Sequence, residues 1–521
     1  MLRIARIVSQ ILFFCIFIVL LYGFNNQQHV QKLQTEIFLQ INPLVSLLTS
    51  LASRQVITVL LPGAVVVTVV TILLGRVFCG WICPLGAAVD FSDRYIIGKA
   101  RHVARRPHIY IQRLKYVLLI ALIVLSMFGM IFPFFMDPIS IITRITTIVI
   151  DPALNYLGIS SVNTWKAVNN LFANEKQGFQ IAQVVATGSM AACITFVMVF
   201  IGGFWDKRFW CQYVCPTGAF LGLLSRIPVL RRKVNTDTCN SCHACATRQC
   251  PVRAISHDDV KVTNSAECIV CGVCSQNKRD CTTFTFGYGK EVPPGAPVLA
   301  RRHFVTGILA GVVAPSILKG SGSDHISQVQ PVRPPGSIPE AEFLTRCIGC
   351  GECMKVCPNH ALQPCGFIDG MMKLNTPKLV PSVGYCEPSC TACTNVCPTV
   401  AIRPVEQEDK PFTKIGTAIV NKDHCLAWRG EIRCMICKKH CPYQAITEEE
   451  IECGETTLSG PTVNKDLCTG CGACEKYCAA GSNPAIKIYI QGERRISDGP
   501  VISDKKKARI KKERDEILRA E

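Results

Sequence analysis

The feature that most constrains this chain is a series of six cysteine clusters after residue 238, each with four cysteines. Four of the six contain a C-x2-C-x2-C run, which places thiolates too close together to pair comfortably as disulfides but wraps one loop around a [4Fe-4S] cube. Two neighbouring clusters span only about 60 to 80 residues, too little for a stable core without staples. We therefore predict small α+β domains of the bacterial two-cluster ferredoxin type, which unfold when their clusters are removed.

In two-cluster ferredoxins, the fourth cysteine of each run crosses over to ligate the neighbouring cluster. Applied to neighbouring runs, this rule predicts six ligand sets. They are Cys239, Cys242, Cys245 with Cys281; Cys268, Cys271, Cys274 with Cys250; Cys347, Cys350, Cys353 with Cys397; Cys386, Cys390, Cys393 with Cys357; Cys425, Cys434, Cys437 with Cys478; and Cys468, Cys471, Cys474 with Cys441. Cys281 departs most from the pattern, because it follows Cys274 after six residues and no proline comes after it.

Two other cofactors fit parts of these runs. Structural zinc also takes four thiolates, but zinc sites usually use two spaced C-x2-C pairs, so we interpret the runs as six [4Fe-4S] sites. The segment CNSCH, from Cys239 to His243, also matches the attachment pattern of a c-type haem. Haem attachment would leave Cys245 and Cys250 without partners, which favours the iron–sulfur interpretation. The four remaining cysteines are predicted to be non-ligands: Cys15, Cys193, Cys365 and Cys453.

The first part of the chain predicts a multi-pass α-helical membrane domain. Apolar residues make up 49% of the chain and are concentrated before residue 230. Four stretches approach the ~20 residues that a membrane helix needs: about Ile7 to Phe24, Val56 to Gly75, Tyr116 to Phe135 and Ile181 to Phe204. Weaker apolar pieces at 37–51 and 139–157 are predicted to be interfacial or re-entrant.

The distribution of positive charge predicts the orientation of this domain. Residues 76–115 carry eight Lys and Arg residues, against two in 25–55 and three in 136–180. The positive-inside rule therefore places the N-terminus, and the segment after residue 205, in the cytoplasm. Because much of the net charge of +18 flanks the apolar segments, it gives no reason to expect a nucleic-acid partner. The basic run from Lys505 to Arg514 is read as a solvated helix end.

The membrane part contains an internal repeat. The segment GRVFCGWICPLGA after the second predicted span matches DKRFWCQYVCPTGA after the fourth, so Arg76 corresponds to Arg208. The repeat would bring four cysteines to one membrane face: Cys79, Cys83, Cys211 and Cys215. Together they can supply four thiolates to an iron–sulfur centre or another metal. The alternative is that these cysteines and prolines only shape helix ends, since a buried cysteine packs as a small hydrophobe.

These patterns divide the chain into five parts. They are a four-helix membrane domain at 1–230, a cytoplasmic two-cluster ferredoxin domain at 231–295, a signal or anchor helix at 300–320, a four-cluster polyferredoxin domain of two ferredoxin-like units at 340–500, and a basic tail at 501–521. The helix at 300–320 begins with Arg301 and Arg302, and its apolar run of about 15 residues is nearer a signal sequence than a comfortable span. Uncleaved, it would be a fifth membrane anchor; cleaved, it would separate the two halves.

The combination of motifs resembles two families joined head to tail. Up to about residue 290, the spans, the two C-x3-CP motifs and the ferredoxin segment resemble NapH, a membrane iron–sulfur subunit associated with periplasmic nitrate reductase. From Arg301 onward, RRHFVTG, four cysteine tetrads and the long gap in CLAWRGEIRC, which contains Trp428, resemble NapG and the MauM ferredoxins. The resemblance implies that the membrane half takes electrons from a quinol. It also implies that the second half is exported by the twin-arginine route and passes electrons to a periplasmic acceptor.

The resulting functional hypothesis is a membrane-bound component of a quinol dehydrogenase in the cytoplasmic membrane, with quinol as its substrate. Electrons would pass through the [4Fe-4S] clusters to a periplasmic terminal reductase of the nitrate reductase type or to a c-type cytochrome. No dinucleotide-binding G-x-G-x-x-G motif follows a strand, so a nicotinamide donor is not expected. Asp137, Arg144 and Asp151 are candidates for quinone binding or proton release. The alternative is a membrane iron–sulfur factor that assembles or matures a respiratory metalloenzyme.

Overall fold

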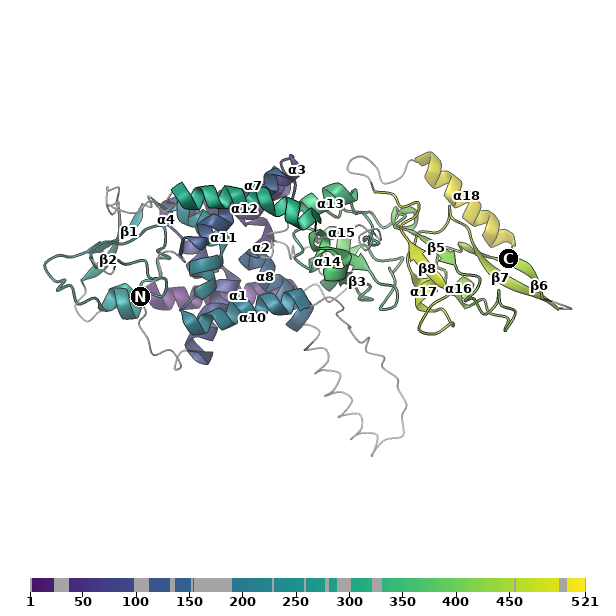
Figure 1. The fold of residues 1–521 in the computed structure, drawn as a ribbon, viewed down its shortest axis with the longest axis horizontal. Helices are drawn as coiled ribbons and strands as arrows, with labels where there is room; N and C mark the ends of the chain where they lie inside the picture. The colour runs from purple at the N-terminus through teal and green to yellow at the C-terminus, as the bar shows by residue number, and fades with distance from the viewer. Residues whose placement is uncertain are drawn as a thin grey trace, which may run out of the picture. The chain divides into compact units, whose positions relative to one another are not determined.

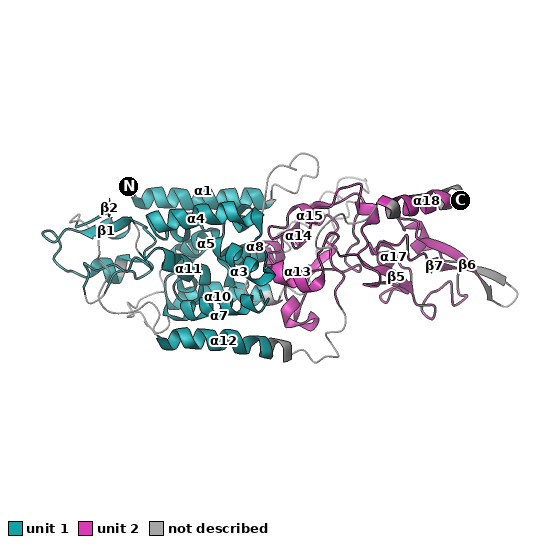
Figure 2. Ribbon diagram, turned by 90° about the horizontal axis from the view of Figure 1, so that it is seen from above, with its two compact units in different colours: residues 1–145, 192–321 teal, residues 146–191, 322–521 magenta. Residues whose placement is uncertain are grey.

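The computed structural model describes residues 2–22, 37–97, 112–131, 136–150, 153, 190–226, 229–256, 259–276, 281–287, 301–320, 330–453, 456–495 and 504–520. The chain divides into two compact units (Figure 2). The first consists of residues 1–145 and 192–321, and the second of residues 146–191 and 322–521. The first unit is mainly helical, whereas the second is built mostly from short helices and two-stranded antiparallel sheets (Figure 1). The predicted ferredoxin segment at 231–295 belongs to the helical unit.

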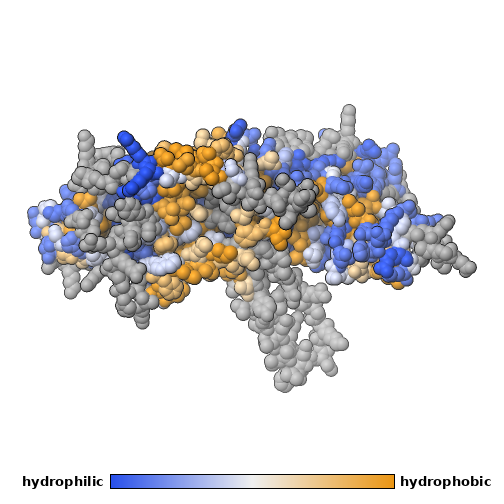
Figure 3. Space-filling view, in the orientation of Figure 1, coloured by the Kyte–Doolittle hydropathy of each residue, from blue (hydrophilic) through white to orange (hydrophobic). Residues whose placement is uncertain are grey.

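Five apolar helices make up most of the first unit: α1 (Leu2–Tyr22), α4 (Leu61–Leu74), α7 (Leu114–Met127), α10 (Met190–Trp205) and α12 (Arg301–Gly320). Within the described residues, α1 alone is long and apolar enough to pass as a membrane span, and α4, α7 and α10 are shorter apolar helices. Large apolar side chains point outward on them; Val8, Val66 and Met198 are each more than half exposed. Figure 3 shows apolar residues gathered over this helical part of the molecule.

The sequence repeat is also a structural repeat. Each copy has a short helix that begins at a proline, a long apolar helix, a π-helical turn and a second helix that begins at a proline. In chain order, the first copy is α3 (Pro43–Ser53), α4, η3 (Phe78–Ile82) and α5 (Pro84–Phe91), and the second is α8 (Pro138–Ile145), α10, η7 (Trp210–Val214) and α11 (Pro216–Leu224). Proline suits the first turn of a helix because its missing N–H would have no partner there. The remaining short elements are α2 (Ile37–Gln40), η2 (Thr58–Leu60) and η4 (Ser92–Ile96).

Helix α12 packs along α7 in the same direction. A Cβ atom built on Gly307 would lie 2.9 Å from Cβ of Ile120, and one on Gly311 would lie 2.6 Å from Cβ of Val124. Both distances are too short for any larger residue, so the two glycines, spaced four apart, let the helix backbones approach closely. This small-residue spacing is typical of helices that pack in membranes.

The ferredoxin segment of the first unit is closed by a short antiparallel sheet. Strand β1 (Leu230–Val234) pairs with β2 (Thr282–Phe286), and Arg232 lies opposite Phe284. Between the strands are the turns η8 (Cys245–Gln249) and η9 (Cys274–Gln276). Buried Glu267 anchors this segment to the helices, because it bonds Arg76 at 2.9 Å, Lys115 at 2.5 Å and the Tyr116 hydroxyl at 3.0 Å. Burial would raise the pKa of Glu267, but Lys115 and Arg76 hold it below its ordinary value.

The second unit repeats a small α+β pattern. Its helices and helical turns are η6 (Thr146–Ile150), α13 (Glu340–Arg346), α14 (Glu352–Lys355), η10 (Phe367–Asp369), η11 (Met371–Lys373), α15 (Ala392–Asn395), η12 (Lys410–Phe412), α16 (Ile436–Lys439), α17 (Ala473–Lys476) and α18 (Asp504–Ala520). Among its described residues, three antiparallel pairs form the sheets: β3 (Leu362–Pro364) with β4 (Pro377–Leu379), β5 (Thr417–Val420) with β8 (Ile486–Tyr489), and β6 (Ile446–Cys453) with β7 (Thr456–Val463). Helix α14 contacts α15, and α16 contacts α17.

The apolar core of the second unit is made partly of cysteines. One core cluster packs Ile446, Leu467 and Ile486 with Cys437, Cys468 and Cys474. Ile510 of α18 belongs to the same core. The basic tail is therefore not only a solvated helix end: one face of α18 is docked on the ferredoxin fold, and Arg514 lies over the ring of Tyr443.

Candidate iron–sulfur sites

Left-handed backbone residues shape the loops that carry the cysteines. In each of the four C-x2-C-x2-C runs, the residues just before and just after the middle cysteine have positive φ. They are Ser241 and His243, Val270 and Gly272, Gly349 and Gly351, and Gly470 and Gly472. A residue with positive φ turns the backbone in the opposite sense to its neighbours. In the runs at 347 and 468 these residues are glycines, which adopt positive φ without steric cost. In the runs at 347 and 468, the loop winds around one side of a cavity.

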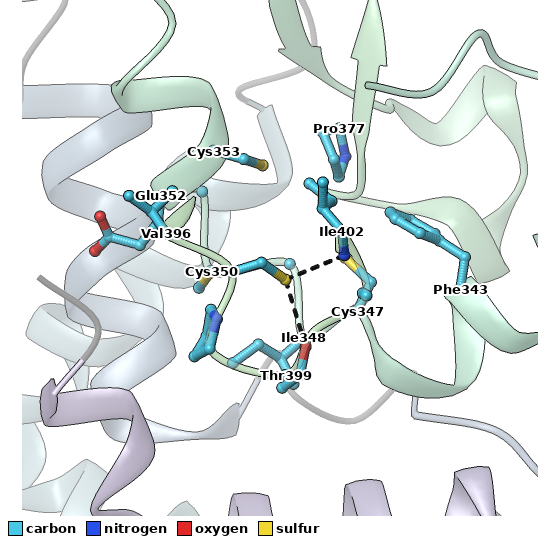
Figure 4. A pocket seen from close by; sticks show the side chains of 15 residues that line it. Phe343, Cys347, Ile348, Cys350, Glu352, Cys353, Pro377, Val396, Thr399 and Ile402 are labelled. Carbon is cyan, nitrogen blue, oxygen red and sulfur yellow. Dashed lines mark hydrogen bonds between the residues drawn. The ribbon is translucent and has the colours of Figure 1, made fainter. Parts of the chain in front are cut away.

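One cavity in the second unit is lined by four of the predicted ligands (Figure 4). Cys347, Cys350 and Cys353 come from one loop, and Cys397 comes from the next run. Apolar side chains such as Phe343 and Ile402 close the cavity, which has an empty volume of about 350 Å³. We call it the Cys347 site.

Three further cavities in the second unit have the same construction. They are the Cys386 site, with Cys386, Cys390, Cys393 and Cys357; the Cys425 site, with Cys425, Cys434, Cys437 and Cys478; and the Cys468 site, with Cys468, Cys471, Cys474 and Cys441. In all four cavities, three cysteines of one run face the fourth cysteine of the neighbouring run. The structure thus brings together the same sets of cysteines that the crossover rule groups.

Backbone amides point at the sulfur atoms of the fourth cysteines. The N–H groups of Ile402, Ala445 and Ala485 donate to Cys397, Cys441 and Cys478, at N···S distances of 3.4, 3.3 and 3.3 Å. After each of these cysteines, the third residue along has positive φ, which turns the chain back over the sulfur: Val400, Gln444 and Gly481. Such N–H donors stabilise negative charge on sulfur and thereby tune a bound cluster.

The donor set fits an iron–sulfur cluster. Burial raises the pKa of the Cys347 and Cys471 thiols to about 12, so four thiolates would not share such a cavity without positive charge among them. A coordinated metal deprotonates its thiols outright and supplies that charge. In the described parts of the chain, no three His, Cys, Asp or Glu side chains come close enough to share a single metal ion. Thiols spread around a cavity suit a cube, whereas tetrahedral zinc needs all its sulfurs about 2.3 Å from one point.

Buried cationic side chains lie beside individual thiols. The Lys410 ammonium donates to Sγ of Cys386 at 3.2 Å and to the Cys390 carbonyl at 2.8 Å. Burial favours the neutral amine, but the neighbouring Cys386 sulfur raises the pKa of Lys410, so this side chain stays charged. In the first unit, buried Arg232 donates to Sγ of Cys245 at 3.6 Å. Sequence reasoning missed both residues, because no motif marks them and they come near sulfur only through the fold.

The four sites of the second unit form a series. The thiol of Cys353 in the Cys347 site interacts electrostatically with Cys393 in the Cys386 site. The Cys386 amide donates to the carbonyl of Cys471 in the Cys468 site at 2.8 Å. The thiol of Cys474, also in the Cys468 site, interacts with Cys437 in the Cys425 site. The spatial order is therefore Cys347, Cys386, Cys468 and Cys425 sites, which differs from the order along the chain.

The ferredoxin segment of the first unit groups its cysteines less completely. Cys250 and Cys268 pack against the core cluster that contains Cys271, and both thiols interact with that of Cys274, so the predicted Cys268 set is brought together. For the other set, the backbone places Cys281 near Cys239: the carbonyl of Cys281 accepts from the Asn235 amide at 2.9 Å, and the Asn235 carbonyl accepts from the Cys239 amide at 3.1 Å.

The remaining candidate residues lie in several environments. The four cysteines of the C-x3-CP motifs lie together in the first unit. Asp137 is buried and accepts hydrogen bonds from Asn42 at 2.5 Å and Thr217 at 2.9 Å, and Arg144 is also buried. Asp151 and the side chain of Cys453 lie outside the described residues. The predicted non-ligands Cys15, Cys193 and Cys365 line none of the four cavities.

Comparisons with known proteins agree with these sites. A sequence family described as a 4Fe-4S binding domain matches residues 56–103 and 188–236, which contain the two C-x3-CP motifs. A second family of the same description matches residues 343–363 and 461–478. Both descriptions name iron–sulfur binding, and the second pair of ranges contains the cysteine runs that begin at Cys347 and Cys468. No solved structure matches the chain.

The chain is also similar to curated ferredoxin-type proteins. It is 37% identical over 166 residues to the ferredoxin-type protein NapG of Escherichia coli, an alignment that covers 30% of this chain and 69% of that protein. It is 35% identical over 194 residues to the methylamine utilization ferredoxin-type protein MauM of Methylorubrum extorquens, covering 34% of this chain and 80% of the relative. An uncharacterized protein of Methanocaldococcus jannaschii is 27% identical over 242 residues, covering 44% of this chain and 81% of that protein. Over about a third of its length, therefore, the chain belongs to the NapG and MauM family of ferredoxin-type proteins.

Proposed function

We propose that the chain is a membrane-bound electron carrier, a component of a quinol dehydrogenase, that passes electrons from the quinol pool to a periplasmic terminal reductase. The observation that carries this proposal is the series of four neighbouring four-cysteine cavities in the second unit. Together with the Cys239 and Cys268 sets, they give six [4Fe-4S] sites. Each bound cluster supplies one-electron oxidation and reduction, at a potential set by hydrogen bonds and burial.

The chain's own residues hold and tune these sites. Cysteines from two runs fix each position, and backbone amides at Ile402, Ala445 and Ala485 stabilise charge on sulfur. The buried ammonium of Lys410 favours the reduced form of its site, because reduction adds negative charge. Quinol oxidation releases two electrons and two protons; the electrons enter the series singly, and Asp137 and Arg144 are the candidates for quinone binding or proton release.

A multi-pass membrane domain with a fifth anchor is supported by the outward-facing apolar side chains of α1, α4, α10 and α12. Helix α12 runs parallel to α7, and His303 at its start interacts with Arg113 just before α7. Two parallel helices begin on the same side, so Arg302 would remain in the cytoplasm with the basic loop at 76–115. The second unit would then emerge in the periplasm, in keeping with a NapH-like half fused to a NapG-like half.

The acceptor is proposed from the family. The resemblance to NapG favours a periplasmic reductase of the nitrate reductase type as the acceptor, reached directly or through a c-type cytochrome. The proposal is tested by electron flux in sealed liposomes that contain the full-length chain and an internal menaquinol pool. Impermeant ferricyanide outside should be reduced, and the Cys437→Ser variant, which interrupts the end of the series, should lose most of this activity. Equal rates with and without the chain would overturn the proposal.

The arrangement across the membrane has its own test. Alkaline phosphatase fused after residue 330 should be active, because that enzyme folds only outside the cytoplasm, whereas a fusion at residue 290 should be inactive. Antibodies against tags at the two termini should detect one band of full length, as expected for an uncleaved α12. Two fragments, or activity of the fusion at residue 290 alone, would contradict this topology.

A further inference from the structure

The four cysteines of the two C-x3-CP motifs form one buried cluster in the first unit. Each thiol interacts electrostatically with the other three: Cys79, Cys83, Cys211 and Cys215. Cys83 and Cys215 are buried, and Cys79 and Cys211 are partly buried. Each matched copy of the repeat brings only two motif cysteines, so four ligands are available only when both copies contribute to one site.

Several helix N-termini meet at this cluster. Cys83 is the N-cap residue of α5 and Cys215 is the N-cap residue of α11, where the Gly218 amide donates to Sγ of Cys215 at 3.2 Å. The N-terminus of α8 lies beside them, because its first-turn partner Asp137 bonds Thr217 of α11 and interacts with Cys83. The partial positive charge at a helix N-terminus stabilises thiolates.

Two buried arginines cross between the copies of the repeat. Nη2 of Arg76, from the first copy, lies 2.8 Å from where a Cβ on Gly218 of the second copy would be. Arg208, from the second copy, donates to the carbonyls of Cys79 at 3.3 Å and Gly86 at 3.4 Å in the first. Both side chains are almost completely buried.

Each arginine shares its carboxylate with a second buried cation, which is Lys115 at Glu267 and Arg6 at Asp90. Arg76 pairs with Glu267 at 2.9 Å, and Arg208 pairs with Asp90 at 2.5 Å. Burying two guanidinium groups beside four thiols raises the free energy of the folded state unless the thiols carry negative charge. A role of the cysteines in packing alone does not account for this arrangement.

The cluster of thiols touches the second ferredoxin loop. Cys79, like Cys250 and Cys268, packs against the core cluster that contains Cys271. The Trp81 indole donates to the Val270 carbonyl at 3.2 Å, which fixes the turn that bears Cys79 on the loop that bears Cys271. A redox centre at the four thiols would therefore be a direct neighbour of the Cys268 site, the one that Cys268, Cys271, Cys274 and Cys250 are predicted to form.

We propose that Cys79, Cys83, Cys211 and Cys215 together hold a seventh iron–sulfur cluster, and that Arg76 and Arg208 balance its negative charge. A cluster is favoured over a single metal ion, because no three of the described Cys, His, Asp or Glu side chains are close enough to share one ion. Its role as the first centre to accept an electron from quinol, which then passes to the Cys268 site, rests on the proposed function. The existence of the site does not.

Native mass spectrometry of the full-length chain, purified without oxygen in detergent, counts bound clusters as integers. Wild type should carry seven clusters, and the Cys79→Ser and Cys211→Ser variants should carry six. Cys193→Ser is the matched control, because Cys193 is a partly buried cysteine of α10 outside every set, and it should keep seven. The six clusters retained by the variants show that the rest of the chain is folded.

Six clusters in wild type, or a single zinc or copper ion lost from both variants, would overturn the proposal. Arg76→Gln tests the arginine clamp: it should shift the reduction potential of one centre while the count stays at seven, and an unchanged set of potentials would contradict that role. Failure of the site and failure of the proposed function are distinguishable. Seven clusters that quinol does not reduce leave the site intact, whereas six clusters that quinol does reduce leave the proposed function intact.

Discussion

The buried ammonium of Lys410 is the clearest single-residue control on a cluster site in this chain. It lies 3.2 Å from Sγ of Cys386 and stabilises the more negative, reduced state. Replacing Lys410 with Met should lower the midpoint potential of the Cys386 site on the order of 60 mV, a tenfold change for one electron. Redox titration followed by electron paramagnetic resonance measures this shift. The Lys410→Arg variant keeps the positive charge and should retain most of the wild-type potential, and the exposed control Lys465→Met should leave the potential unchanged. An unaltered potential in Lys410→Met would refute the role of this ammonium.

Glu340 shows a second residue-scale effect, on stability. It bonds buried Arg333 at 2.6 Å and Arg495 at 2.6 Å. Burial would raise the pKa of Glu340, but these arginines hold it below its ordinary value. Its contribution is therefore complete above the unfolded pKa of about 4.3 and is lost as the pH falls through the lower, folded pKa.

The Glu340→Gln variant should consequently lose stability at neutral pH, on the order of 3 kcal/mol, because it leaves buried guanidinium charge uncompensated. Glu431→Gln removes an exposed partner of Arg429 and should cost less than about 1 kcal/mol. Thermal loss of the visible cluster absorbance compares the two variants. Equal losses of stability in the two variants would contradict a stabilising role for the ion pairs of Glu340.

Residues of this kind mark the limit of prediction from sequence. Cysteine spacing predicts the ligand sets because a loop that wraps a cube must repeat its spacing. Lys410 follows Cys386 by 24 positions, and Arg333 lies on a segment of no recognisable pattern. Their contacts depend on how distant segments of the chain pack together, and the spacing of cysteines in the sequence does not predict that packing.

At the scale of elements, α12 should behave as a permanent helix of the first unit rather than as a removable signal. Gly311→Val should disrupt its packing, because even a Cβ would lie 2.6 Å from Cβ of Val124. Ala310→Val, one position away on the exposed side of the same helix, is the matched control. The thermal midpoint of the detergent-solubilised chain should fall by several degrees in Gly311→Val and should stay at the wild-type value in Ala310→Val. No difference between them would contradict the packing.

The sequence predicted the long apolar helices and the cysteine repeat but not the full extent of that repeat. Short helices α3 and α8 begin after Asn42 and Asp137, each followed by proline, and these two side chains bond one another at 2.5 Å. The shared pattern of Asn or Asp before Pro was visible in the sequence. Two residues alone are too weak a signal, however, until the fold brings the pair together.

At the scale of the whole molecule, the cluster sites stabilise the fold as well as transfer electrons. Three-residue strands such as β3 and β4 are marginal by themselves, and the core around Ile446 and Ile486 is completed by cysteines. Removing iron with a chelator under reducing conditions should therefore unfold residues 330–495 while the helices α4 and α7 persist. Hydrogen exchange with mass spectrometry should show full exchange in the first segment and retained protection in the helices. Protection throughout 330–495 after iron loss would contradict a structural role.

The central claim is that quinol feeds electrons into this series of sites. The most direct measurement is anaerobic addition of menaquinol to the full-length chain in liposomes, with the clusters followed by electron paramagnetic resonance at low temperature. The account predicts signals from reduced clusters in both units, and the Cys437→Ser variant should lose the signal of the Cys425 site alone. Clusters that stay oxidised with quinol over a wide range of potentials, yet are reduced by dithionite, would contradict it.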